Sequence, residues 1–154
     1  TPRMLEGPFG AARTLVEDTL RSVGVAPEKV IARDDASAVA WSLKRGSAKV
    51  LVSIARHEKN GDAWFRVAAS VMVLPDDPAK RTSLFQRLLE LNAKGLVNAA
   101  FGLVGDRVIA ASERPIVGLD AVEVDQMIKH LSAVADTYDD RLVDEFGGKR
   151  AADA

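Results

Sequence analysis

Cysteine is absent from this chain of 154 residues, and aromatic residues make up only 5% of it. Without thiols the chain forms no disulfide and offers no thiolate ligand or cysteine nucleophile. Its two imidazoles, His57 and His130, lie far apart and outside any carboxylate spacing typical of a zinc or iron site. The carboxylates of residues 136–145 spread over several faces of a predicted helix, so we interpret them as solvated. We expect no metal and no cofactor.

Catalytic motifs and long hydrophobic runs are missing as well. The sequence has no Gly-x-Ser-x-Gly elbow, and the glycines of Gly102-Leu103-Val104-Gly105 fall in a predicted hairpin rather than before a helix, where a phosphate would bind. No window reaches the roughly 18 uncharged apolar residues that a membrane span needs. The sequence therefore predicts a non-enzymatic, cytoplasmic protein that does not enter a membrane.

Hydrophobic residues make up 47% of the chain, which is enough for one sizeable core. We expect a single domain over residues 1–148 and a disordered tail over residues 149–154. Residues 25–37 are polar and contain a proline, which favours a connector without regular structure.

Three segments have apolar residues at a helical period of 3.6. These predicted helices span about residues 9–23, 78–94 and 121–146. Asp77 is placed to cap the second of them, with proline at its first helical position. Asp120 and Glu123 form a capping box for the third, which ends at a pair of glycines.

Five strand-like segments are joined by predicted two-residue turns at Asn60-Gly61, Gly46-Ser47 and Gly105-Asp106. The registers counted from the first two turns agree in placing one apolar set on a single sheet face, which supports both, and the third turn adds residues of its own hairpin to the core face. The set comprises Val39, Trp41, Leu43, Val50, Val52, Ile54, Phe65, Val67, Ala69, Val71, Val73, Phe101, Leu103, Val108 and Ala110. The order α-β-β-β-α-β-β-α then predicts an α+β two-layer sandwich, with an antiparallel sheet and helices on one of its faces.

The opposite sheet face carries alanine, serine and glycine with a few larger side chains. Those larger residues are Leu51, Trp64, Arg66, Met72 and Ile109. Such a face is too apolar for a solvated sheet and too poor in large side chains for a second core. We predict that these five residues bind a protein or peptide, unless the connector or a helix of the same chain covers them. Trp64 is expected to be at least partly accessible.

A single-stranded nucleic acid is an alternative ligand for the same region. Lys44, Lys49 and Arg66, with Arg56 nearby, could hold phosphates while Trp64 stacks on bases. The net charge of −1 and the lack of aromatic spacing typical of RNA-binding sheets argue against it. A regulatory protein that only dimerises is the other alternative.

Several short motifs between Leu88 and Gly148 resemble one known family. The most specific are Arg114-Pro115, Gly118-Leu119-Asp120, and the ending from Tyr138-Asp139-Asp140 to Glu145-Phe146-Gly147-Gly148. In these motifs the sequence resembles the YbjN family, which is grouped with the CesT-type, type III secretion chaperone-like proteins. The resemblance implies the same α+β arrangement, a homodimer, and chaperone-like binding of a client protein or peptide. It does not identify the client.

Overall fold

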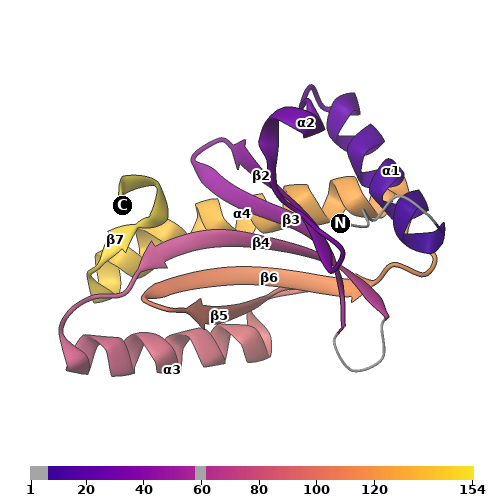
Figure 1. Cartoon of the computed structure of the whole chain (residues 1–154). Coiled ribbons are helices and arrows are strands. Elements are labelled where there is room, and N and C mark those ends of the chain that lie inside the picture. Colours follow the sequence, from indigo (N-terminus) through magenta and orange to yellow (C-terminus); the bar gives the residue numbers. More distant parts are fainter. Residues whose placement is uncertain (1–6, 58–61) are drawn as a thin grey trace. The chain divides into compact units, whose positions relative to one another are not determined.

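The computed structural model describes residues 7–57 and 62–154 (Figure 1). Within these ranges, helices and an antiparallel sheet form the α+β fold that the sequence predicts. None of the helices in the described ranges is both long and apolar enough to cross a membrane. The predicted turn at Asn60-Gly61 lies outside the described residues.

The helices of the described residues are α1 (Gly7–Ser22), α2 (Pro27–Val30), α3 (Pro78–Lys94), α4 (Ala121–Phe146) and the short 3-10 helix η1 (Ala151–Asp153). The strands are β1 (Ile31–Asp34), β2 (Ala38–Arg45), β3 (Ala48–Arg56), β4 (Ala63–Val73), β5 (Ala100–Val104), β6 (Arg107–Pro115) and β7 (Lys149–Arg150). They pair in the order β1-β2-β3-β4-β6-β5, and β7 pairs with β4. Strands β1 and β5 are therefore the two edges.

Packing divides the chain into two compact units. Unit 1 comprises residues 1–43, 51–67 and 113–129, and unit 2 comprises residues 44–50, 68–112 and 130–154. Strands β2, β3, β4 and β6 and helix α4 contribute residues to both. The expectation of one domain over residues 1–148 stays a prediction.

The alternation of buried and accessible residues along the strands confirms the predicted core face. Of that set, Trp41, Val52, Phe65 and Val71 have no exposed surface, whereas Val73 is half-buried. Such alternation follows from the pleat, which points successive side chains to opposite faces. In the core of unit 1, the indole Nε1 of Trp41 has no hydrogen-bond partner among the described residues.

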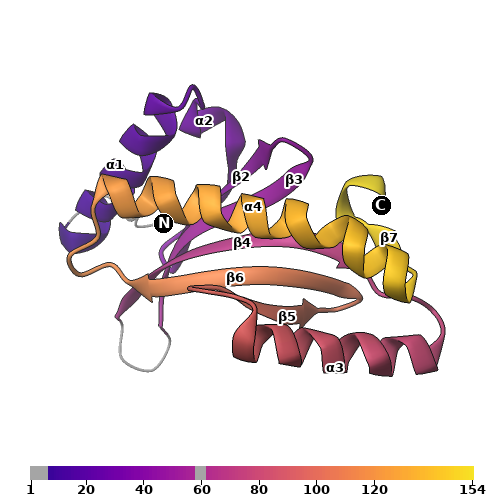
Figure 2. The same cartoon turned by 180° about the vertical axis from the view of Figure 1, so that it is seen from behind.

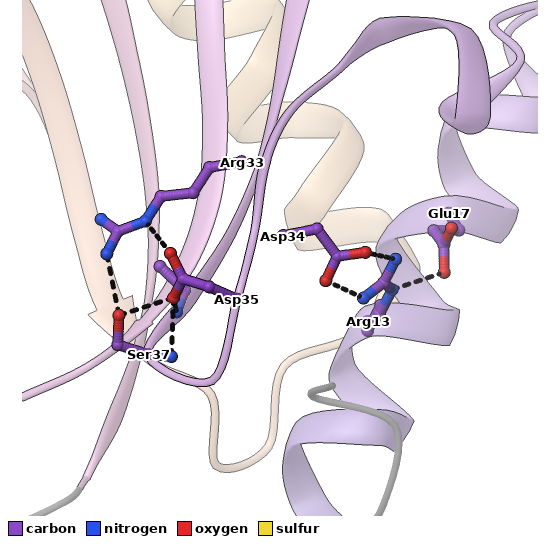
Figure 3. Close-up of polar contacts among 7 residues, drawn as sticks. Arg13, Glu17, Arg33, Asp34, Asp35 and Ser37 are labelled. Atoms are coloured by element: carbon purple, nitrogen blue, oxygen red, sulfur yellow. Dashed lines mark hydrogen bonds and ion pairs between the residues drawn. The ribbon is translucent and has the colours of Figure 1, made fainter. Parts of the chain in front are cut away.

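In unit 1, the predicted connector is instead helix α2 followed by strand β1. Strand β1 pairs antiparallel with β2, joining Ile31 to Trp41 and Asp34 to Val39, with an irregularity after Ile31. The side chain of Asp35 accepts hydrogen bonds from the backbone of Ser37 (2.8 Å) and of Ala38 (3.0 Å), which shapes the turn into β2 (Figure 3). A polar connector can therefore extend a sheet when its own carboxylates satisfy the turn.

In unit 2, α3 begins and ends as predicted. The Asp77 side chain accepts a hydrogen bond from the backbone of Ala79, Pro78 occupies the first turn, and Gly95 ends the helix. Helix α3 runs alongside β5 (Figure 1), where the side chain of Asn92 bonds both the backbone N–H (2.7 Å) and the carbonyl (3.1 Å) of Phe101. The helix thereby supplies hydrogen bonds that an edge strand lacks.

The β5–β6 hairpin has the predicted register, with Phe101 opposite Ala110 and Leu103 opposite Val108. One side chain departs from the predicted core face, because Leu103 is 48% exposed although Val108 opposite it is buried. Leu103 lies on the edge strand close to the turn, where no further strand flanks it. Phe101 is buried and meets Tyr138 of α4 edge-on, with ring centroids 5.4 Å apart.

The predicted disordered tail is wrong for the segment after α4. Lys149 and Arg150 form β7, antiparallel to Val73 and Met72 of β4, and η1 follows. A strand of two residues is too short to show a hydrophobic periodicity, so the sequence pattern does not predict it. Only its pairing with β4 defines it.

Candidate functional site

A hollow of about 340 Å³ lies beside Trp64 in unit 1. Its lining consists mainly of aromatic, proline and aliphatic side chains: Pro8, Phe9, Asp62, Ala63, Trp64, Pro115, Ile116 and Val117. Trp64 is half-buried, as predicted, and Val117 is 83% exposed. The hollow thus presents one large indole and several apolar surfaces to solvent, an arrangement common in sites that bind apolar side chains.

The wall from Pro115 to Val117 is held in place by one arginine. Arg114 donates from Nε to the Pro115 carbonyl (2.9 Å) and from Nη2 to the Val117 carbonyl, and it pairs with Glu123 in the first turn of α4. The wall also joins the sheet, since the backbone N–H of Ile116 donates to the carbonyl of Ala63 at 3.2 Å. This side of the hollow is therefore preorganised before any ligand arrives.

Phe9 brings the first turns of α1 into the same hollow. The guanidinium of Arg56, on β3, lies 3.2 Å from the centroid of the Phe9 ring. A cation over an aromatic face is attracted by the ring quadrupole, which ties α1 to the sheet at this point. The covering by the chain's own first helix is partial, since Trp64 keeps accessible surface.

Arg66 follows Trp64 on the accessible face of β4 and pairs with Glu113 of β6 at 3.4 Å. Their side chains are 41% and 53% exposed, so both charges remain hydrated. Leu51, the third predicted site residue in unit 1, is 43% exposed on β3. Leu51, Trp64 and Arg66 thus all keep accessible surface, and their role in binding stays a prediction.

The two other predicted site residues belong to unit 2, and the chain itself covers one of them. Ile109 is half-buried on β6, opposite the exposed Gly102. Met72 has no exposed surface, because the segment that forms β7 lies on it and Arg150 is its strand partner. Met72 is therefore no part of an open binding face.

Sequence reasoning misses most of the hollow's lining. The helical pattern accounts for Phe9 only as the start of an amphipathic helix, and Pro115 and Ile116 stand out only as motif or turn residues. No periodic pattern connects residues 9, 64 and 116. They meet only in the folded chain, through the pairing of the strands and the hydrogen bonds that Arg114 donates. The Arg114-Pro115 motif is the one signal in the sequence that points to this loop.

The basic residues proposed for nucleic acid do not form a free stripe in unit 1. Arg66 is paired with Glu113, and Arg56 is stacked on Phe9. A phosphate would compete with both interactions, which weakens the nucleic-acid interpretation. Lys44 and Lys49, in unit 2, are exposed.

A second groove in unit 1, of about 510 Å³, lies between α1 and the first turns of α4, which begin close to α1 in Figure 2. Leu15, Val23 and Val122 supply apolar surface, and Asp18 and Asp125 lie among its lining residues. Both carboxylates are already paired, Asp18 with Arg21 (3.1 Å) and Asp125 with Lys129 (2.7 Å). Its rim is therefore close to neutral.

Unit 2 has four exposed aliphatic side chains on α3, on β5 and in the loop between them, which we call the apolar patch. They are Leu89 (69% exposed), Val97 (78%), Leu103 (48%) and Val104 (60%). Exposed aliphatic side chains on neighbouring elements are typical of surfaces that another protein covers.

Among the acidic residues of α4 at positions 136–145, Asp139 departs from the sequence-based interpretation, whereas Asp136, Asp140, Asp144 and Glu145 are exposed as expected. Asp136 accepts a hydrogen bond from Ser47 in the β2–β3 turn at 3.0 Å. Asp139 is buried, and burial raises its pKa, although the N–H of Asp140 partly opposes the shift. In the described parts of the chain, no group of three or more histidine, aspartate or glutamate side chains could hold a metal ion.

One protein family matches nearly the whole chain. A family model described as "T3SS (YopN, CesT) and YbjN peptide-binding chaperone 1" matches residues 11–154, which confirms the predicted resemblance. No curated protein sequence matches the chain significantly.

Solved structures with a similar fold include a type III secretion chaperone and two other protein complexes. The HopA1–SchA chaperone–effector complex gives a TM-score of 0.54 at 13% identity, covering 83% of this chain and 92% of that one. The Yersinia pestis chaperone SycH, solved with a fragment of YscM2, gives 0.53 at 14% identity, with coverages of 82% and 98%. The ExoU–SpcU complex of Pseudomonas aeruginosa gives 0.51 at 14%, with coverages of 84% and 96%. At these identities the likeness establishes the fold alone.

Proposed function

Because this chain belongs to the family of type III secretion and YbjN peptide-binding chaperones, we propose that it binds an unfolded segment of a client protein in the Trp64 hollow. The observation that carries the proposal is a half-buried tryptophan that lines an apolar hollow with a preorganised wall. Aromatic anchors in such positions commonly dominate the affinity of protein interfaces.

The hollow suits a client segment with an apolar side chain flanked by polar residues. An aliphatic or aromatic group would lie between Trp64, Phe9 and Ile116, where it loses its contact with water. The exposed Arg66–Glu113 pair offers both signs of charge to the polar residues on either side. Leu51 is a further exposed apolar side chain on the neighbouring strand β3, outside the lining of the hollow. This mode uses only surfaces of the folded protein, so the protein would act without catalysis. Membership of a family of type III secretion and YbjN chaperones supports action in the cytoplasm.

Known complexes of the same fold support a proteinaceous client. The HopA1–SchA structure is named a chaperone–effector complex, and ExoU–SpcU is named a heterodimeric complex from a type III secretion system. A client of the present chain would likewise be a protein, recognised while at least part of it is extended.

Affinity for a permanently unfolded protein tests the proposal. Reduced, carboxymethylated α-lactalbumin, labelled with fluorescein, serves as the probe and is titrated with the chain while anisotropy is recorded. Trp64→Ala is expected to weaken binding about fivefold or more, close to 1 kcal/mol, because the indole contact is lost. The matched control is Val122→Ala, an exposed apolar truncation in unit 1 outside the hollow, which should leave the affinity unchanged. Equal affinities for both variants would contradict the site.

We also propose that the chain forms a homodimer through the apolar patch of unit 2. Leu89, Val97, Leu103 and Val104 are the exposed large side chains there, and a second copy would remove them from water. Twofold pairs are the commonest soluble oligomers, and the same patch can face itself across the axis.

Light scattering coupled to size exclusion tests the dimer at micromolar concentration. Leu89→Asp is expected to shift the mass to that of a monomer, because an unpaired carboxylate would be buried in the interface. Val122→Asp introduces the same charge at a similarly exposed site in unit 1 and should leave the dimer intact. A monomeric mass for the unaltered chain would contradict this part of the proposal.

A further inference from the structure

The accessible face of β4 is fully covered only near its C-terminal end, at Met72. Along this strand Trp64, Arg66, Ala68 and Ser70 are all half-buried, as alternate residues on one face should be. Met72 continues the series, yet it has no exposed surface. Something other than the sheet therefore covers Met72.

The covering element is the segment after α4. The chain leaves the helix through Gly147 and Gly148, whose φ angles of +82° and +85° reverse its direction, and then pairs as β7 with Met72 and Val73. A Cβ on Gly148 would lie 2.3 Å from the carbonyl oxygen of Val73 and 3.2 Å from Cε of Met72. Only glycine permits so close an approach between the two backbones.

The contacts that hold this segment in place are weak ones. Strand β7 has two residues, and Arg150 pairs with Asp140 (3.3 Å) and with Asp153 (2.8 Å). The side chains of Asp140 and Asp153 are 67% and 54% exposed, so solvent screens both pairs. Local opening of so small an element costs far less than global unfolding.

We propose that the end of β4 at Met72 and Val73 is a docking slot for an extended peptide, which the chain's own residues 148–150 occupy in this structure. Residues 148–150 indicate which ligand would compete with them. It would place a glycine against the Val73 carbonyl and, two positions later, an arginine that faces Asp140. Backbone pairing with β4 supplies the remaining contacts, as in other cases of strand addition. That the outside ligand is a client segment rests on the proposed function. The slot lies in unit 2, and its binding does not require the Trp64 hollow of unit 1.

Oxidation of Met72 measures whether the slot opens. The variant Gly148→Ala must move β7, and Gly105→Ala is its control, because Gly105 has φ +59° but open space where an added Cβ would lie. With dilute hydrogen peroxide and mass spectrometry, Met72 is expected to become a sulfoxide about tenfold faster in Gly148→Ala than in Gly105→Ala. Arg150→Ala, which keeps the glycine, should give a smaller acceleration. Met127, which is 5% exposed in unit 1, reports any general unfolding. Rates for Met72 that match between Gly148→Ala and Gly105→Ala would overturn the proposal.

Protection by an added peptide measures whether the open slot binds. The synthetic peptide GGKRAADA, which has the sequence of residues 147–154, is added at millimolar concentration to Gly148→Ala. It should slow the oxidation of Met72 to near the rate of the unaltered chain, whereas the peptide GGKAAADA should protect less. No protection by GGKRAADA would show that β7 is only a structural ending, and equal protection by both peptides would remove the role of Arg150. Neither readout involves Trp64 or α-lactalbumin, so failure here is separate from failure of the proposed function.

Discussion

The two edge strands of the sheet are secured by different chemistry. Strand β1, in unit 1, has four residues on the exposed side of the sheet edge and is held through charges. Arg13 donates two hydrogen bonds of 2.9 and 3.1 Å to Asp34 and one of 3.3 Å to Glu17 (Figure 3). Strand β5, in unit 2, is held by the neutral amide of Asn92 and by the burial of Phe101. One edge relies on ion pairs and the other on packing.

That difference suits the two edges to different surroundings. Charged side chains and an irregular register on β1 discourage another strand from pairing with it, so this edge tolerates water. Around β5 the exposed residues are aliphatic, so this edge gains most when a second protein surface covers it. The contrast fits solvent at β1 and the proposed self-association at β5.

Truncating Phe101 should give the largest loss of stability. Phe101→Ala removes a buried ring and its contact with Tyr138, so unfolding should become easier by about 3–5 kcal/mol. Chemical denaturation followed by circular dichroism measures this. Leu103→Ala on the same strand is the control and should cost far less, since Leu103 is 48% exposed. Comparable losses for the two would mean that β5 is not held by packing.

Removing the amide of Asn92 should cost less than removing the ring. Asn92→Ala leaves the backbone N–H and carbonyl of Phe101 without their side-chain partners, which is expected to cost about 1–3 kcal/mol. The amide proton of Phe101 should also exchange faster with solvent. Gln86→Ala, an exposed amide on the same helix, should leave both quantities unaltered. Unchanged exchange at Phe101 in Asn92→Ala would disprove the role of this amide.

At the other edge, the two arginines of Figure 3 should differ in importance. Asp34→Ala removes the bidentate partner of the buried Arg13, so we expect a loss of about 1–2 kcal/mol that shrinks in high salt. Arg33→Ala breaks only the pair with Asp35, whose side chains are 56% and 41% exposed, and should change stability by less than about 0.5 kcal/mol. If both variants behaved alike, β1 would not depend on Arg13.

Acid should loosen β1 before β5. The hydrogen bond from Arg33, and then those from Ser37, lower the pKa of Asp35 below its ordinary value of 3.8. A lowered folded-state pKa adds stability that is present above pH 3.8 and is lost as the pH falls through that value toward the lowered one. Hydrogen exchange at Ser37 and Ala38, corrected for intrinsic rates, should therefore accelerate in this window, while Phe101, bonded to neutral Asn92, should not respond. In Asp35→Asn the acid response of Ser37 should disappear, and its persistence would assign the effect to another group.

Elements defined by local chemistry could be predicted from the sequence. The Gly105-Asp106 turn fixed the β5–β6 register residue by residue, and Asp77 and Asp120 marked the starts of α3 and α4. Turn and cap residues act on backbone groups within four positions of themselves. Their effect can therefore be predicted without knowledge of the rest of the fold.

Elements that exist only through distant pairing could not be predicted. Strand β1 depends on Arg13 of α1, 21 positions away, and β7 depends on a glycine fitting against Val73. For the same reason the strand pattern places Met72 on an open face, since the alternation along β4 is right and only the later segment covers it. The Trp64 hollow is half-predictable: its anchor follows from the strand pattern, whereas its lining comes from a loop and a helix end.

The accessibility of Trp64 in the presence of a bound peptide tests the central claim most directly. In the variant Trp41→Phe, Trp64 is the only tryptophan, so its fluorescence and its quenching by acrylamide report on the hollow alone. Saturating amounts of an unlabelled, tryptophan-free peptide that binds the chain are predicted to shift the emission of Trp64 to shorter wavelength and to reduce its quenching at least about twofold, because the ligand would cover the indole. Binding of the peptide with the emission and quenching of Trp64 unchanged would contradict the account.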